Sequence, residues 1–181
     1  MADPEPGWPA AFRSVAAALR RALGLWALRI DHIGSTSIPD LAAKPIVDVQ
    51  ITTQNPADLD AAEHPALGEL EAVGFVLMVD NDDRRKRFLL LRDSARGWPD
   101  TNLHVRRDGC VSQQQALLLR DYLRSSESAR TRYEQDKRRL SRCDWPSVDD
   151  YANAKGDVVW ALLREADVWS WSGWEPGPSD L

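Results

Sequence analysis

Cysteine is scarce in this sequence, and long apolar runs are missing. Two cysteines, Cys110 and Cys143, occur among 181 residues, too few for a disulfide framework or a cysteine metal centre. No apolar run approaches the roughly 20 residues that a membrane-spanning helix needs. Residues 1–7 are acidic and proline-rich, without the basic and then apolar order of a secretory signal. We therefore expect a cytoplasmic protein that has no membrane partner.

An excess of positive charge is also missing. The formal net charge is −5, so no overall field attracts nucleic acid, and we expect no nucleic-acid partner. A basic run at 84–87 follows acidic residues within 80–83 that balance it. This run is either a solvated charged loop or a loop that contacts a phosphate or a substrate beside a cleft.

The length and the 43% of apolar side chains suit one compact domain with a full core. Helical periodicity predicts helices over 9–23, 113–124, 127–140 and 147–166, and an interrupted helical region over 55–73. Strand patterns predict strands over 28–33, 46–51, 75–79, 87–92 and 102–106.

These elements predict an α/β (α+β) fold: a mixed, largely antiparallel β-sheet with flanking helices and a helical C-terminal portion that closes one side of a cleft. We expect one domain over residues 1–168 and a tryptophan-rich tail over 169–181. Because tryptophans are unfavourable in water, part of this tail is expected to pack on the domain or on a second copy. The chain is expected to be a monomer or a homodimer.

The most informative stretch covers residues 32–51, where a strand, a turn and a second strand follow one another. Gly34 lets the backbone turn sharply and approach a ligand. Ser35, Thr36 and Ser37 place three hydroxyls next to free backbone N–H groups, an arrangement that favours an anion such as phosphate. The alternative is that these hydroxyls only stabilise the turn.

The second strand carries Asp48 and Gln50 on one face, because strand side chains repeat with period two. A strand carboxylate opposite a Gly-Ser turn suits Mg²⁺ and a nucleoside triphosphate, since Mg²⁺ takes one or two carboxylates together with phosphate oxygens and water. Asp48 is therefore the metal candidate; the alternative is a buried Asp that caps the turn. Lys44, at the entrance of the strand, either reaches a triphosphate or is solvated.

Two lysines lie on apolar helix faces, each one turn after a tyrosine. Tyr133 precedes Lys137, and Tyr151 precedes Lys155. Such lysines either extend outwards or form structural ion pairs, or they point inwards to acidic groups or phosphates.

His104 alternates with the apolar residues beside it on a predicted strand. It either takes the place of a metal-binding carboxylate or accepts a proton near neutral pH. A core histidine with satisfied hydrogen bonds is the structural alternative.

The stretch Gly34–Val49, which reads GSTSIPDLAAKPIVDV, resembles the GrpB family, a group of small proteins in the nucleotidyltransferase superfamily. The resemblance continues at 102–105, at 120–124 and at the two tyrosine–lysine pairs, and covers roughly residues 9–167. It implies a nucleotidyltransferase-like sheet. The superfamily pattern has two strand carboxylates at i,i+2, but the second position here is Gln50, and the later strand that supplies a third offers His104.

The residues and the resemblance together predict nucleotidyl transfer from a nucleoside triphosphate to a small-molecule acceptor, with Mg²⁺ held by Asp48. The candidate catalytic residues are Asp48, Gln50 and His104. The candidate phosphate- and substrate-binding residues are Gly34, Ser35, Thr36, Ser37, Lys44, Arg120, Tyr133, Lys137 and Lys155.

Two further hypotheses stay open. Gln50 favours a non-catalytic module of the same fold that binds a nucleotide or another anion. The third hypothesis is an enzyme of different chemistry that acts on a carboxylate- or phosphate-bearing metabolite in the same cleft, with His104 as the base.

Overall fold

The computed structural model describes residues 2–78, 85–92 and 97–179, apart from the side chains of residues 148, 149, 151 and 152. In these ranges the helices are α1 (Trp8–Leu23), α2 (Pro65–Val73), α3 (Val111–Ser125), α4 (Glu127–Leu140) and α5 (Val148–Ser170). The strands are β1 (Arg29–Ile33), β2 (Val47–Thr53), β3 (Val76–Met78), β4 (Lys86–Leu91) and β5 (Thr101–Arg107).

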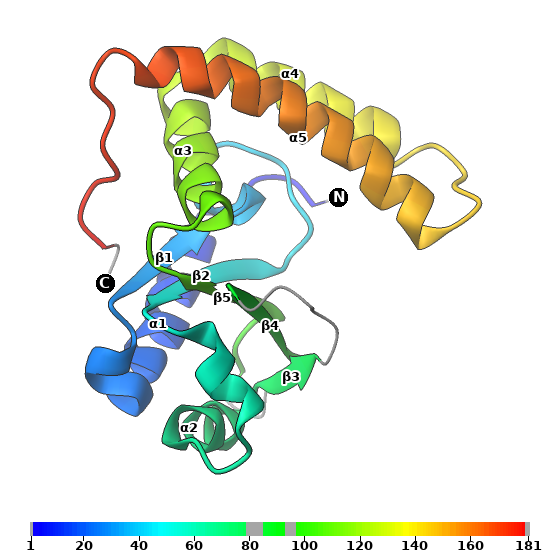
Figure 1. The fold of residues 1–181 in the computed structure, drawn as a ribbon. Coiled ribbons are helices and arrows are strands. Elements are labelled where there is room, and N and C mark those ends of the chain that lie inside the picture. The colour runs from blue at the N-terminus through cyan, green and yellow to red at the C-terminus, as the bar shows by residue number, and fades with distance from the viewer. Residues whose placement is uncertain (1, 79–84, 93–96, 180–181) are drawn as a thin grey trace.

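The strands form one mixed sheet in the order β1-β2-β5-β4-β3 (Figure 1). β2 and β5 are parallel, and every other neighbouring pair is antiparallel. The parallel pairing sets Asp48 beside Asn102 and Gln50 beside His104. The predicted mixed, largely antiparallel sheet is therefore confirmed.

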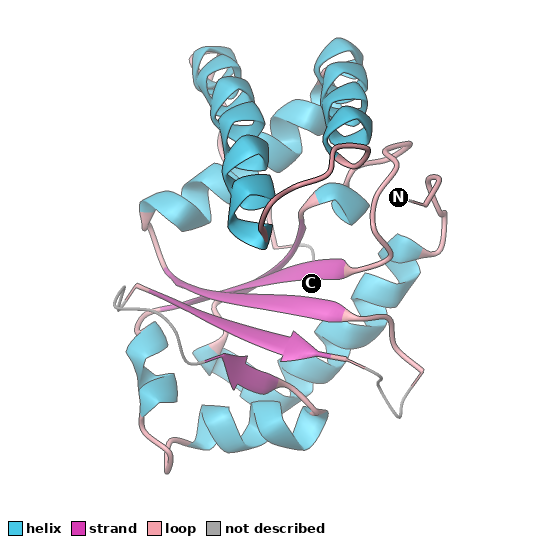
Figure 2. Ribbon diagram, turned by 90° about the vertical axis from the view of Figure 1, so that its right-hand side faces the viewer, coloured by secondary structure: helices cyan, strands magenta, loops and turns pink. Residues whose placement is uncertain are grey.

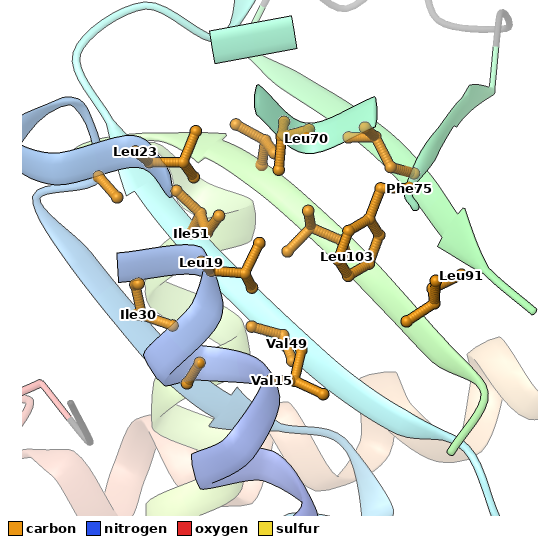
Figure 3. Packing of buried hydrophobic residues seen from close by; sticks show 14 of the residues in the cluster. Val15, Leu19, Leu23, Ile30, Val49, Ile51, Leu70, Phe75, Leu91 and Leu103 are labelled. Atoms are coloured by element: carbon orange, nitrogen blue, oxygen red, sulfur yellow. The ribbon is translucent and has the colours of Figure 1, made fainter. Parts of the chain in front are cut away.

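One face of the sheet carries the main apolar core, which α1 and α2 cover. Figure 3 shows Val15 and Leu19 of α1 facing the sheet residues Val49, Ile51 and Leu103. All five of these side chains are fully buried. Burial of this layer stabilises the sheet by about 25 cal/mol per Å² of apolar area removed from water.

The other face of the sheet looks toward α3, α4 and α5. Figures 1 and 2 show these helices on the side of the sheet opposite α1 and α2. They hold a second apolar cluster, which includes Ile38, Leu123, Tyr133 and Leu162. The molecule therefore has a sheet between two helical layers.

Alternation along β2 and β5 decides which side chains meet the second helical layer. Val49, Ile51 and Leu103 point into the main core, so the residues between them point to the opposite face. That face carries a polar set from the two strands: Asp48, Gln50, Asn102, His104 and Arg106.

The predicted elements agree with the structure, apart from boundary shifts. The helical region expected over 55–73 divides into a 3₁₀ turn, Pro56–Asp60, and α2, because Pro65 starts a new helix. Helix α5 extends to Ser170, beyond the expected end at 166 and past the predicted domain boundary at 168. Residue 79, the end of an expected strand, lies outside the described residues.

The tail after α5 runs back to the level of β1 (Figure 1). The indole of Trp174 donates to Asp121 Oδ2 at 3.1 Å, and Ser179 Oγ bonds both backbone groups of Ile30. Trp171, by contrast, is 77% exposed. Part of the tail therefore packs on the domain, as the sequence predicts.

Candidate functional site

The turn after β1 and the middle of β2 meet at Gly34 and Asp48. Gly34 has φ +68° and ψ −170°, a conformation that is essentially restricted to glycine. A Cβ added to it would lie 2.3 Å from Asp48 Oδ2. Glycine is therefore required here both by the backbone and by the carboxylate that packs against it.

Asp48 is held by two side chains of the neighbouring strand. Asn102 Nδ2 donates to Asp48 Oδ1 at 2.8 Å, and His104 Nε2 lies 3.5 Å from the same oxygen. Burial favours the neutral acid, but the hydrogen bonds from His104 and Asn102 and the charge of Lys155 outweigh it and lower the pKa of Asp48. The carboxylate is thus ionised at neutral pH.

His104 is the hydrogen-bonding partner of Asp48 and packs on Phe88 with ring centroids 5.0 Å apart. Burial lowers its pKa, and the charge of Arg106 acts in the same direction, while the bond to Asp48 opposes them. The imidazole is therefore neutral at pH 7. Because a carboxylate only accepts, the Nε2 of His104 carries the proton that faces Asp48.

The position of the second carboxylate in the superfamily pattern is occupied by an amide that binds an arginine. Gln50 is fully buried. Its Oε1 accepts from Arg106 Nη1 at 2.5 Å, and its Nε2 donates to the Gln113 carbonyl at 3.5 Å. A guanidinium therefore stands where a metal-binding pair of carboxylates would need negative charge.

The three hydroxyls of the turn have different roles. Ser37 Oγ donates to the Gly34 carbonyl at 2.6 Å, and Thr36 Oγ1 lies 3.1 Å from His32 Nε2. Ser35 faces a cavity, and no intramolecular partner of its hydroxyl is found among the described residues. The turn also uses the N–H groups of Ser37 and Ile38 in its own 3₁₀ hydrogen bonds. The expectation of free N–H groups next to the hydroxyls is therefore wrong for Ser37 and Ile38.

The cavity at Ser35 has a volume of about 280 Å³ and gathers three of the sequence-predicted lysines. We call it the lysine pocket. Its polar lining comes from Ser35, Thr36, Lys44, Asp48, Asn102, Lys137, Ser141 and Lys155. With Lys137 and Lys155 facing one carboxylate, Asp48, the pocket has an excess of positive charge, which suits a polyanion.

Lys137 is buried, and its Nζ donates to the Ala42 carbonyl at 2.7 Å. The ammonium also lies 5.2 Å from the centre of the Tyr133 ring. Burial, with the nearby charge of Lys155, lowers the pKa of Lys137 to about 8. For Lys137 the structure therefore supports the inward orientation and not the outward one.

Lys155 is exposed at its position on α5 but lines the same pocket. Its charge acts on Asp48, His104 and Lys137 alike. The side chain of Tyr151, the tyrosine expected beside it, lies outside the described residues.

A second cavity, of about 450 Å³, lies between the polar face of the sheet and helices α3 and α5. We call it the sheet–helix cavity. It shares Asp48, Asn102 and Lys155 with the lysine pocket, so the two form adjoining parts of one site.

Arg120 and Tyr133 line the sheet–helix cavity rather than the lysine pocket. Arg120 is buried, donates to Asp121 at 2.7 Å and lies 3.6 Å from Asp31. Its charge is thus shared with two carboxylates of the protein. Gly34 borders this cavity as well.

Within the basic run at 84–87, Arg87 is buried and pairs with Asp60. It is opposite Val105 in the β4–β5 register, on the face of the main core. Arg87 is therefore directed away from the candidate site. Residues 80–84 lie outside the described residues.

The side chains available as metal ligands decide whether Mg²⁺ fits the site. Among the described residues, no group of three or more His, Cys, Asp or Glu side chains is placed to hold a metal ion. Asp48 is one carboxylate with lone pairs on the edge of the lysine pocket. Because Mg²⁺ often keeps its waters and takes one carboxylate together with phosphate oxygens, Asp48 fits an ion that arrives with a triphosphate, and does not fit a two-metal centre.

Two residues of the site were missed as functional candidates, Asn102 and Arg106. They alternate with His104 along β5, so strand periodicity places all three on one face. The parallel pairing with β2 was the missing information, because only that pairing sets them beside Asp48 and Gln50.

Comparison with known proteins shows which family and which solved structures the chain is similar to. The sequence profile of the GrpB protein family matches residues 1–165. A UPF0157 protein of Halalkalibacterium halodurans is 36% identical over 164 residues, which are 91% of this chain and 80% of the relative. A dephospho-CoA kinase of Mycolicibacterium paratuberculosis is 33% identical, and the match covers 97% of this chain but 48% of the kinase. The chain thus spans about half the length of that kinase.

Solved structures show the same fold. The crystal structure of GrpB from Enterococcus faecalis superposes with a TM-score of 0.78 at 28% identity, over 93% of this chain and 98% of that one. The Cid1 poly(U) polymerase with bound MgGTP superposes with a TM-score of 0.56 at 18% identity, over 77% of this chain and 44% of the polymerase. The chain therefore has a nucleotidyltransferase-like fold. In the described part of the chain, no helix combines the length and apolarity needed to cross a membrane.

Proposed function

Because the chain belongs to the GrpB family and has a nucleotidyltransferase-like fold, we propose that its lysine pocket binds the phosphate groups of a nucleoside triphosphate. The observation that carries this proposal is the convergence of Lys44, Lys137 and Lys155 on one small cavity. Each ammonium is a compact charge that suits phosphate oxygens. The Ser35 hydroxyl adds a donor at the turn.

A solved structure with the same fold and two kinases of similar sequence support the choice of ligand. The Cid1 polymerase, which shares the fold, was solved with bound MgGTP. The mycobacterial relatives that contain a similar half are named dephospho-CoA kinases, and the ligand in that name carries an adenosine phosphate. ATP, GTP, UTP and dephospho-CoA are therefore the first ligands to measure.

The test is isothermal titration of each ligand into the wild type and into Lys155→Gln. Loss of one charge-assisted contact is expected to weaken triphosphate binding by about tenfold or more. Arg164→Gln is the matched control, because Arg164 is an exposed cation on the same helix that borders neither cavity of the site. If both variants weaken triphosphate binding equally, the effect comes from the net charge of the protein. That result would contradict a lysine-lined phosphate site.

Nucleotidyl transfer to a small acceptor is the finer proposal, and the placement of Asp48 opposite the Gly34–Ser35 turn favours it. Asp48 would hold a Mg²⁺ ion that accompanies the triphosphate; bound there, the ion neutralises phosphate charge. Lys137 and Lys155 would stabilise the negative charge on the departing pyrophosphate. Binding of a nucleotide without turnover is the alternative, and Gln50 in its contact with Arg106 favours it.

Metal dependence separates these two proposals. For transfer, Mg²⁺ is expected to strengthen triphosphate binding in the wild type, and Asp48→Asn is expected to remove that gain. Pyrophosphate release, measured with a coupled phosphate assay, is expected to require both Mg²⁺ and Asp48. If Mg²⁺ changes triphosphate affinity equally in the wild type and in Asp48→Asn, transfer is contradicted. Nucleotide binding without turnover would then be the function.

A further inference from the structure

The sheet–helix cavity has two unlike walls. One wall is the polar sheet face with Asp48, His104 and Arg106, and the other is an apolar helix surface with Leu119, Leu123, Val159 and Leu163. Its volume of about 450 Å³ lies in the range of cavities that bind small molecules. The proposed role of the lysine pocket does not account for this space.

Arg106 has unused hydrogen-bonding capacity in this cavity. Its Nη1 donates to Gln50 Oε1 and to the Ser112 carbonyl. Among the described residues, its Nη2 and Nε have no acceptor, and no carboxylate is within ion-pairing distance. Burial lowers the pKa of Arg106, since the guanidinium is poorly solvated. A partly buried guanidinium with a free edge is a site for an anion.

The charges around the cavity favour an anion of low charge. Arg106 and Lys155 contribute two positive charges, and Asp48 contributes one negative charge. His104 is neutral, and the charge of Arg120 is compensated in part, because Arg120 shares Asp31 with Arg29 and Asp121 with Arg124. Arg106 and Lys155 exceed Asp48 by one positive charge, so the cavity suits an anion. The apolar helix wall disfavours a strongly hydrated phosphate dianion and favours a carboxylate with an apolar body. The helix wall in turn offers apolar contact to the body of the ligand.

We propose that the sheet–helix cavity binds a small monocarboxylic acid, with its carboxylate on the free edge of Arg106 and its apolar body against α3 and α5. The carboxylate contact is to Arg106, which lines the sheet–helix cavity and not the lysine pocket, although the two cavities share Asp48 and Lys155. That the acid is the second substrate of the site rests on the proposed function, since the two cavities adjoin at Asp48 and Lys155.

The test is a titration followed by saturation-transfer NMR and calorimetry. The probes are straight-chain carboxylates from butyrate to decanoate and 4-phenylbutyrate, each compared with its neutral amide. We expect at least one carboxylate to bind at millimolar concentration or below, about tenfold or more tightly than its amide. An octyl phosphate probe is expected to bind more weakly than the carboxylate of the same length.

Two variants locate the binding. Arg106→Gln is expected to remove the preference for carboxylate over amide, whereas Arg107→Gln, an exposed neighbour on the same strand, keeps it. Because Arg106 also bonds Gln50 and Ser112, a second variant is needed in case the first unfolds. Leu119→Trp fills the apolar half of the cavity and is expected to abolish binding of the acid with Arg106 intact.

Three results would overturn the proposal: no carboxylate binding, equal binding of acid and amide, or binding that survives Leu119→Trp. Triphosphate affinity is measured on the same samples. Triphosphate binding without carboxylate binding would reject this inference and leave the proposed function standing; the reverse result would reject the lysine pocket as a phosphate site.

Discussion

The α-carbon of Gly34 packs so closely on Asp48 that a methyl group there would lie 2.3 Å from Oδ2 and 2.9 Å from Cβ of the aspartate. The turn after β1 thereby fixes the carboxylate of β2 from one side, while Asn102 fixes it from the other. The position of this carboxylate thus depends on three segments that meet only in the folded chain.

Replacing Gly34 with alanine is expected to displace Asp48 and weaken ligand binding. Gly109→Ala is the matched control, because Gly109 has the same φ of +68° and no atom within 4 Å of an added Cβ. Both variants place a Cβ at a positive φ, and only Gly34→Ala adds the clash with Asp48. We expect Gly34→Ala to lower the free energy of unfolding by about 1–3 kcal/mol more than the control, measured by urea denaturation. Equal losses would show that the contact with Asp48 is not tight in solution.

Triphosphate affinity is expected to fall as the pH rises through about 8, because Lys137 loses its proton there. Lys137→Arg keeps the charge at these pH values and is expected to give a flat profile. Calorimetric titrations between pH 7 and pH 9 would show the difference. If the affinity of the wild type depends on pH as little as that of the variant, Lys137 does not contact the bound phosphates.

The same lysine has the opposite effect on the stability of the ligand-free protein. Its pKa is about 8 in the folded chain, below the ordinary value of 10.5. Between these values the unfolded chain holds more protons, so the contribution of Lys137 to the free energy of unfolding rises with pH. Urea denaturation at pH 8 and at pH 10 is expected to show this rise in the wild type and not in Lys137→Arg.

Acid is expected to destabilise the protein through His32. This imidazole is stacked on Phe12, and burial lowers its pKa to about 3. The unfolded chain takes up the proton near pH 6.5, so stability is lost as the pH falls from there toward 3. His32→Asn is expected to flatten this dependence of the free energy of unfolding. His64→Asn, at the N-terminus of α2, is the control, and the same flattening in it would argue against His32 as the cause.

Gln50→Asp would restore the second carboxylate of the superfamily pattern. We expect little gain in Mg²⁺ affinity from this change alone, because the new carboxylate would pair with Arg106, which now donates to Gln50. The double variant Gln50→Asp, Arg106→Gln frees it and is expected to bind Mg²⁺ with triphosphate more tightly than either single variant. Calorimetry of the four proteins forms a double-mutant cycle, and additive effects would contradict the pairing.

The sequence determined the elements of this fold by itself, because their signals are local. Ser126 and Ser147 accept N–H bonds at the starts of α4 and α5, where serine is a preferred capping residue. Gly74 ends α2 in the left-handed conformation. The alternation along β2 separates Asp48 from the apolar residues beside it. All of these depend on neighbours within a few residues.

The site was only partly determined in this way. The turn Gly34–Ser37, Asp48 and the lysines could be named from spacing and resemblance. Which hydroxyl keeps its hydrogen-bonding capacity for a ligand could not, because Ser37 bonds the Gly34 carbonyl and Thr36 bonds His32. Ser35 and Thr36 both line the pocket.

The tertiary structure alone decided what surrounds Asp48. β2 and β5 are more than forty residues apart in sequence, and their parallel pairing brings Asn102, His104 and Arg106 to the carboxylate and to Gln50. Strand periodicity fixes the face of each side chain but not the neighbour of its strand. The order of the sheet is set by burial of the whole apolar core against α1 and α2, a sum over many distant contacts. For that reason the residues could be listed from the sequence, while their chemistry as a group depends on the fold.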